Sequence, residues 1–196
     1  MYFSYFIFNK SKAKTIILIH GAYGTAGYWL PYLNLFNNYK IILFNMNYSA
    51  ILNSDKDLNI TKLLLEKFVL EQNLIAVISH SLGTIFSNFF SSKKQVLNFN
   101  ICPMVYSKRI NSEKFNIELQ SNFNSKNIKL KTNINLINNL IEESKKKIST
   151  TIFYFTPILD NYFIYDFPLE VQKIEFKGDH FRIENAIIMV VKKIDF

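Results

Sequence analysis

Three side chains that together can cleave an acyl bond, a serine, a histidine and an aspartate, each follow a predicted strand of this chain. The serine is Ser81, in the stretch AVISHSLGT (residues 76–84). This stretch is one residue short of G-x-S-x-G, the pattern that places a nucleophilic serine on a sharp turn between a strand and a helix. The turn needs small residues two positions before and after the nucleophile. Gly83 meets this need and Ser79 adds only a hydroxymethyl group. The alternative for Ser81 is an ordinary helix N-cap.

A base for that serine, and a carboxylate to hold the base, are found further along the chain. His180 lies in FKGDHF, after the last predicted strand, and Asp160 lies in FTPILDNYF, after the strand before it. In a serine hydrolase the histidine takes the serine's proton, while the aspartate fixes the imidazole tautomer and stabilises the cation. Asp166 and Asp179 are weaker candidates, because Asp166 lies further from the strand end and Asp179 is adjacent to the histidine. A surface loop is the alternative for His180.

The fourth requirement is a pair of N–H donors for the oxyanion of the tetrahedral intermediate. HGAYG (20–24) directly follows a predicted strand and can aim the N–H of Ala22 at this oxygen, and Leu82, the residue after the serine, supplies the second N–H. A glycine-rich turn is the alternative, and neither phosphate-binding glycine pattern is present. Three side chains near these motifs are expected to line the substrate pocket: Tyr23, Trp29 and His80.

These residues depend on an alternation of strands and helices. Buried or β-branched runs predict strands at 2–8, 15–20, 40–46, 74–79, 96–102, 150–156 and 171–176. Helical spacing of apolar residues predicts helices at about 25–37, 58–72 and 82–90, and from 183 to the end. In the second helix Ile60, Leu64 and Phe68 lie at helical spacing. The alternation indicates a mostly parallel sheet with helices on both faces, whose active site lies at the carboxyl ends of the strands.

Composition indicates one domain spanning residues 1–196, with 49% hydrophobic residues. Residues 107–149 are polar, rich in Asn and Lys, and interrupt the alternation, which predicts a small insertion over one end of the sheet. The single cysteine, Cys102, fits a reducing compartment, so we expect a cytoplasmic protein. The lysines near the N-terminus follow an apolar run instead of preceding it, unlike a secretory signal. No apolar stretch is long enough to span a membrane.

From about residue 14 to its end, the chain resembles the α/β-hydrolase superfamily. IILIHGAYG is similar to the superfamily's oxyanion loop, ISHSLGT to its nucleophile elbow, and GDHF before a terminal helix to the loop of its histidine. The resemblance implies an α/β-hydrolase fold with a small cap and the roles already given: nucleophile, base, orienting carboxylate and two oxyanion donors. The stretch FNMNYSAILNSD (44–55) departs from the pattern, because many members have an acidic residue and a glycine-rich turn there.

The resemblance implies a serine esterase without a cofactor. Small cytoplasmic members include the esterases that demethylate pimeloyl-carrier-protein methyl ester in biotin synthesis, which are similar to this chain in length, oxyanion loop and small cap. A thioesterase or another small acyl hydrolase is the first alternative, and a non-catalytic binding protein of the same fold is the second. Every histidine lies in one of the motifs, so we expect no metal site. We also expect a monomer that does not bind nucleic acid.

The net charge of +8 is concentrated in the predicted insertion. Residues 108–147 hold nine basic and four acidic residues, a net +5. A lysine-rich composition accounts for lysines everywhere but less well for this concentration. Because an acidic acyl carrier protein would be attracted to it, we expect contacts from Lys126, Lys129 and Lys131.

Overall fold

The computed structural model describes residues 1–22, 24–91, 96–109, 132–146 and 151–195. Its centre is a seven-stranded sheet with the order β1-β3-β2-β4-β5-β7-β9. The strands are β1 (Phe3–Phe8), β2 (Thr15–Ile19), β3 (Lys40–Met46), β4 (Leu74–His80), β5 (Leu97–Ile101), β7 (Ile152–Pro157) and β9 (Gln172–Phe176). Only β1 runs antiparallel to its neighbour in this sheet, and the other strand pairs are parallel.

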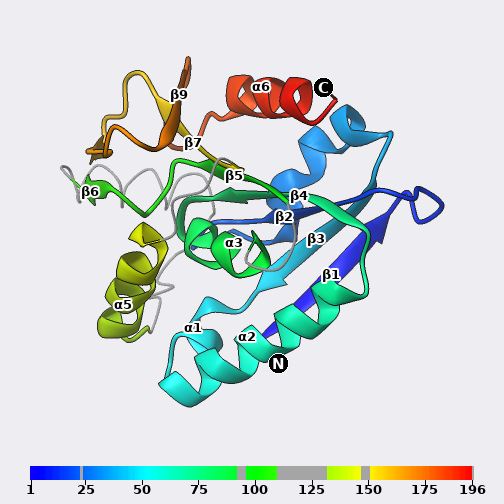
Figure 1. Cartoon of the computed structure of the whole chain (residues 1–196), viewed down its shortest axis with the longest axis horizontal. Helices are drawn as coiled ribbons and strands as arrows, with labels where there is room; N and C mark the ends of the chain where they lie inside the picture. Colours follow the sequence, from blue (N-terminus) through cyan, green and yellow to red (C-terminus); the bar gives the residue numbers. More distant parts are fainter. Residues whose placement is uncertain (23, 92–95, 110–131, 147–150, 196) are drawn as a thin grey trace.

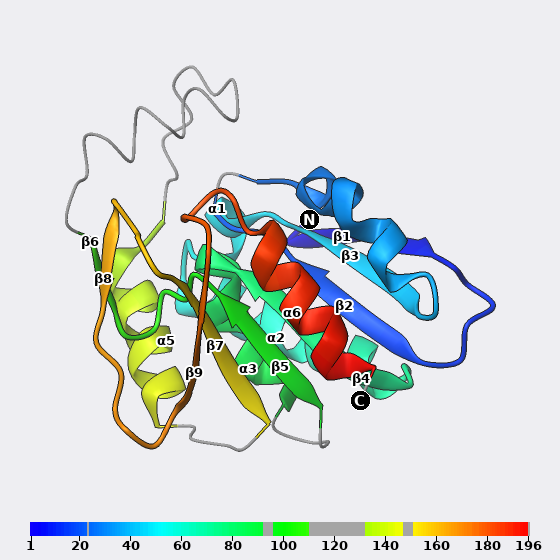
Figure 2. The ribbon, with the colours of Figure 1, turned by 90° about the horizontal axis from the view of Figure 1, so that it is seen from above.

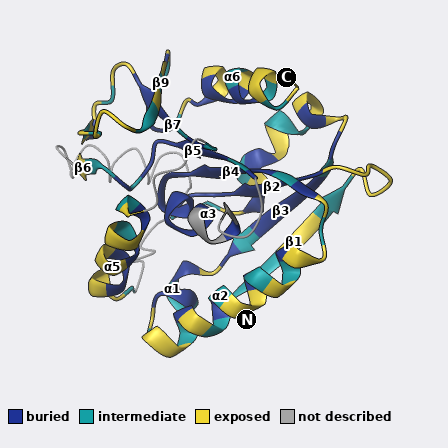
Figure 3. Cartoon of the chain, in the orientation of Figure 1, coloured by how far each residue is buried: buried dark blue, intermediate teal, exposed yellow. Residues whose placement is uncertain are grey.

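The strands that carry the site lie in the middle of this sheet because both of their faces are apolar. All five residues of β2 are buried, and this strand pairs with β3 on one side and β4 on the other. Near-continuous β-branched runs are typical of parallel strands covered by helices on both sides. The central strands are accordingly the darkest part of Figure 3, whereas the helices around them are exposed on their outer sides.

Helices cover both faces of the sheet (Figures 1 and 2). On one face lie α1 (Tyr48–Ile51), α2 (Asp55–Leu70), α3 (Thr84–Ser91) and α5 (Ile134–Lys145), which share a core with Ile17, Ile42 and Val77. On the other lie the 3₁₀-helix η1 (Ala26–Phe36) and α6 (Glu184–Ile194), which share a core with Ile16, Ile41 and Ile78. None of the helices in the described part of the chain is long and apolar enough to cross a membrane.

Two helices differ from their prediction. Thr25 caps the segment expected there, its side chain accepting from the N–H of Gly27, but the segment is a 3₁₀-helix with Pro31 inside it. In α2 the helical spacing of Ile60, Leu64 and Phe68 does not mark the most buried face, although Phe68 packs against the core. The helix buries Leu58, Thr61, Leu65 and Val69, whereas Leu64 is 46% exposed. Leu63, Leu64 and Leu65 are consecutive, so the apolar pattern fits more than one face of the helix.

The described parts of the predicted insertion are regular in structure. Ser107–Arg109 form β6, which pairs antiparallel with β8 (Phe163–Tyr165) in a separate two-stranded sheet. The helix α5 packs against α3 and buries Leu136, Ile137 and Leu140 in the core. This part of the insertion therefore belongs to the body of the fold. Four residues of the predicted site lie outside the described residues: Tyr23, Lys126, Lys129 and Lys131.

Candidate active site

Ser81 stands on a strained turn between β4 and the helix that follows it. Its φ of 50° lies in the left-handed region, which a residue with a side chain rarely adopts. Ser81–Gly83 form a short 3₁₀-helix, η2, which continues into α3. A Cβ at Gly83 would lie 2.6 Å from the carbonyl oxygen of His20, so this position requires glycine. The turn therefore has the strained geometry of a nucleophile elbow.

Ser79 occupies the position where the elbow pattern has its first glycine. It is fully buried, and its hydroxyl donates to the side-chain oxygen of Asn100 on β5, at 2.9 Å. Its side chain is therefore engaged between two strands of the sheet.

His180 reaches Ser81 from the loop between β9 and α6. Its Nε2 lies 3.1 Å from the Ser81 hydroxyl oxygen, a hydrogen-bonding distance for proton transfer. The His180 side chain is 2% exposed, and its ring is stacked on Phe163, with the ring centroids 4.7 Å apart. The pair is therefore held within the protein, with the serine 7% exposed.

His80 is buried beside His180. Its Nε2 lies 2.8 Å from the backbone carbonyl oxygen of His180, and its ring is stacked on Tyr28. Burial, followed by the neighbouring His180, lowers the pKa of His80 to about 3. The ring is therefore neutral at pH 7, with its proton on Nε2, where it can donate to the carbonyl. The sequence led us to expect His80 in the substrate pocket, but here its ring connects the elbow to the loop of His180.

Asp160 lies behind His180, on the loop that follows β7. Its Oδ2 lies 3.8 Å from His180 Nδ1, an ion-pair distance that is longer than a direct hydrogen bond. The carboxylate is held by the chain that follows it. Its Oδ1 accepts from the backbone N–H groups of Tyr162 and Phe163, at 2.8 and 3.1 Å. Its Oδ2 accepts from the hydroxyl of Tyr165, at 2.8 Å.

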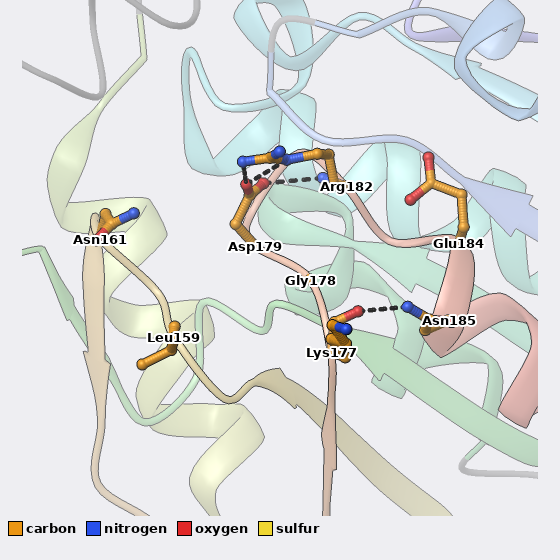
Figure 4. A pocket seen from close by; sticks show the side chains of 8 residues that line it. All are labelled: Leu159, Asn161, Lys177, Gly178, Asp179, Arg182, Glu184 and Asn185. Atoms are coloured by element: carbon orange, nitrogen blue, oxygen red, sulfur yellow. Dashed lines mark hydrogen bonds and ion pairs between the residues drawn. The ribbon is translucent and has the colours of Figure 1, made fainter.

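The two rival carboxylates are directed elsewhere. Asp179 accepts from the backbone N–H groups of Phe181 and Arg182, and it forms an ion pair with the Arg182 guanidinium at 2.5 Å (Figure 4). Burial on its own would raise the pKa of Asp179, but these hydrogen bonds and the arginine outweigh it and lower that pKa. Asp179 thus fastens the turn that presents His180. Asp166 is exposed, and its backbone N–H donates to the carbonyl of Tyr106.

The expected oxyanion loop lies against the elbow. A Cβ at Gly21 would lie 3.0 Å from the Cβ of Ser81. His20 fixes this loop: its Nδ1 lies 2.7 Å from the carbonyl of Gly21, and its Nε2 accepts from the N–H of Met46 at 2.9 Å. Burial lowers the pKa of His20 to about 4, so the ring is neutral and Nδ1 carries its proton. Ala22 follows Gly21, half-buried.

Leu82 is the second residue of η2, and the first N–H groups of a helix have no carbonyl partner within it. Its N–H therefore suits the second oxyanion position. Trp29, expected in the substrate pocket, is instead fully buried in the core between η1, α6 and the sheet. Its indole therefore packs the core and does not line a pocket open to solvent.

A pocket of about 430 Å³ lies beside the loop that carries His180 (Figure 4). It is lined by Leu159, Asn161, Lys177, Gly178, Asp179, Arg182, Glu184 and Asn185, and therefore by neither Ser81 nor His180. Two of its lining residues are basic, Lys177 and Arg182, and two are acidic, Asp179 and Glu184. Within the described residues, no group of three or more His, Cys, Asp or Glu side chains could hold a metal ion.

No protein-family model and no curated protein matches the chain, but solved structures do. A lipase-esterase related protein from Clostridium acetobutylicum is 14% identical, with a TM-score of 0.65, over 100% of this chain and 99% of that one. The carboxylesterase CesB (YbfK) from Bacillus subtilis is 10% identical, also at 0.65, over 98% of this chain and 86% of that one.

A third match is the SrfTE thioesterase domain, described for the cyclization of the lipopeptide antibiotic surfactin. It is 13% identical, with a TM-score of 0.58, over 98% of this chain and 96% of that one. At such identities the likeness concerns the fold. Together with the mostly parallel sheet and the helices on both of its faces, these matches show that the chain has the α/β-hydrolase fold.

Proposed function

We propose that this chain is a serine hydrolase that cleaves carboxylic esters through a covalent acyl-enzyme. The observation that carries the proposal is the 3.1 Å between the Ser81 hydroxyl and His180 Nε2, on a strained turn with Asp160 behind the imidazole. Two structures that share the fold are described as a carboxylesterase and a lipase-esterase related protein, which supports an ester as the substrate.

The reaction has two acyl-transfer steps. His180 takes the proton of Ser81 while the serine oxygen attacks the ester carbonyl, and the N–H groups of Ala22 and Leu82 stabilise the oxyanion. The carbon–oxygen bond to the leaving alcohol then breaks, and the alcohol receives the proton from His180. Water, activated by the same histidine, hydrolyses the acyl-enzyme, which releases the acid and restores the serine. Asp160 stabilises the imidazolium in both steps.

The test is a hydrolysis screen of esters and thioesters, together with labelling by a fluorophosphonate probe. We expect Ser81→Ala and His180→Ala each to lower kcat at least about a thousandfold, and the double variant to lose little more, because these residues act as a unit. Ser79→Ala is the matched control: it should still be labelled by the probe, whereas Ser81→Ala should not. A wild-type chain that neither turns over nor takes up the probe would indicate a non-catalytic binding protein. Hydrolysis of thioesters alone would indicate a thioesterase.

For the substrate, we propose an acyl ester linked to an acidic carrier protein, such as pimeloyl-carrier-protein methyl ester. The support is the net charge of +5 over residues 108–147 and the general rule that complementary charge speeds encounter. A carrier-linked substrate also agrees with the cytoplasmic location that the single Cys102 predicts.

The salt dependence of kcat/KM distinguishes a carrier-linked substrate from a free one. We expect kcat/KM for a carrier-linked ester to fall steeply as ionic strength rises from about 0.01 to 0.15 M, because the Debye length shortens from roughly 30 to 8 Å. A small neutral ester should respond little. Replacing Lys126, Lys129 and Lys131 by Glu should slow only the carrier-linked substrate. Equal sensitivity of the two substrates, or of neither, would contradict a carrier partner and leave a generic esterase.

A further inference from the structure

We propose that Tyr165 is a positioning residue of the active site, whose hydroxyl holds the oxygen of Asp160 that faces His180. This inference rests on the proposed function, because the role of Tyr165 is expressed through the proton transfer between His180 and Ser81. The observation behind it is that Asp160 Oδ2 accepts from Tyr165 at 2.8 Å, and the same oxygen lies 3.8 Å from His180 Nδ1.

The two oxygens of Asp160 are held by different groups. Oδ1 accepts from two backbone N–H groups, so it is fixed by the loop itself. These two N–H groups do not contact Oδ2, the oxygen that faces the imidazole, which takes its hydrogen bond from a side chain. Tyr165 supplies that side chain. Its hydroxyl occupies one lone pair of Oδ2, so that another lone pair of the same oxygen is directed toward His180.

The Tyr165 hydroxyl remains a donor under all ordinary conditions. Burial, followed by the nearby Cys102 and Asp160, raises its pKa far above the usual range. The neighbouring Cys102 is also buried, which raises the pKa of its thiol, and this thiol donates to the backbone carbonyl of Asp179. The single proton of the tyrosine goes to the carboxylate, at 2.8 Å. The carboxylate itself can only accept.

The backbone of Tyr165 is also fixed. Tyr165 ends β8, and this strand is paired with β6, where Ser107 lies opposite Tyr165. Phe163, at the start of the same strand, donates its N–H to Asp160 and stacks on the His180 ring. One three-residue strand thus contacts both the carboxylate and the imidazole, and β6 connects it to the rest of the chain. A side chain on such a strand can hold Oδ2 in one place.

The experiment is Tyr165→Phe, which removes one oxygen atom and keeps the ring. We expect kcat to fall about tenfold with KM unchanged, because the hydrogen bond acts on the transition-state imidazolium more than on the bound substrate. The pH at which kcat/KM reaches half its plateau should also fall, since a less well placed carboxylate stabilises the cation less. The matched control is Tyr106→Phe, whose hydroxyl donates to the Lys145 carbonyl at 3.3 Å and which, like Tyr165, packs against Phe167. It should leave both quantities unchanged.

A double-variant cycle tests whether Tyr165 acts through Asp160. In the Asp160→Asn background, Tyr165→Phe should cost no further activity, whereas independent action would give the same loss in both backgrounds. Assays carried out well below the melting temperature of every variant keep a loss of stability out of this comparison. Unchanged kcat, raised KM alone, or an equal loss in both backgrounds would overturn the role of Tyr165 while leaving ester hydrolysis intact. A wild-type chain as inactive as Ser81→Ala would overturn the proposed function and this inference with it.

Discussion

The positive φ of Ser81 predicts that replacing this residue by glycine and by alanine will have different consequences for stability. A residue with a Cβ at φ 50° is strained, and glycine relieves the strain. Both replacements remove the hydroxyl next to His180, so the hydrogen bond of 3.1 Å is lost equally in the two variants. The difference between them therefore reports the backbone.

Ser79 provides the comparison because it lies two residues earlier, within extended backbone of β4, and is also buried. There, going from alanine to glycine should cost about 0.5–1 kcal/mol of chain entropy and about 0.8 kcal/mol for the buried methyl group. At Ser81 the change from alanine to glycine has the same two costs, but it also relieves the backbone strain, which is worth roughly 1–2 kcal/mol. We therefore expect the step to be about 1–2 kcal/mol less unfavourable at residue 81 than at residue 79.

Thermal and urea unfolding of the four variants measure this difference. A change of 1 kcal/mol corresponds to about 2–4 °C in Tm for a chain of this size. The variants are Ser79→Ala, Ser79→Gly, Ser81→Ala and Ser81→Gly. If the step from alanine to glycine costs the same at both positions, the turn at Ser81 is not strained and the elbow interpretation loses its physical basis.

Two further predictions concern the carboxylates and the buried histidines. Asp160→Asn should lower kcat at least about a hundredfold. Asp179→Asn should instead lower mainly the stability of the fold, because Asp179 holds the turn through Arg182. Steady-state kinetics and melting curves of both variants measure the two effects, and the reverse result would make Asp179 the orienting residue. His20 and His80 have pKa values lowered to about 4 and 3, so the unfolded chain takes up protons first as the pH falls below about 6.5. Urea unfolding should therefore show about 4 kcal/mol less stability at pH 5 than at pH 8, roughly half of which disappears in His80→Gln. Equal stability at both pH values would mean that these rings are not buried in neutral form.

The sheet could be predicted because its strands are marked by local composition. β2 is a run of five buried residues, four of them Ile or Leu, and such a run is specific for a strand covered on both faces. The positions of Ser81 and His180 followed from strands and loops of the same kind. In contrast, the buried face of α2 could not be chosen, since Leu63, Leu64 and Leu65 give it apolar residues on several sides. Only the packing of the whole helix against α3 and the sheet decides between them.

The details of the site that escaped prediction all depend on contacts between distant parts of the chain. His80 looked like a pocket residue because it precedes the candidate nucleophile, but its partner is the carbonyl of His180, 100 residues away. Tyr165 is only five residues from Asp160, yet no spacing rule relates them, because the backbone between them turns back to pair β8 with β6. Short strands of three residues have almost no sequence pattern of their own. The candidate catalytic residues can thus be found by their motifs, whereas the residues that contact and position them are found only when the fold brings them together.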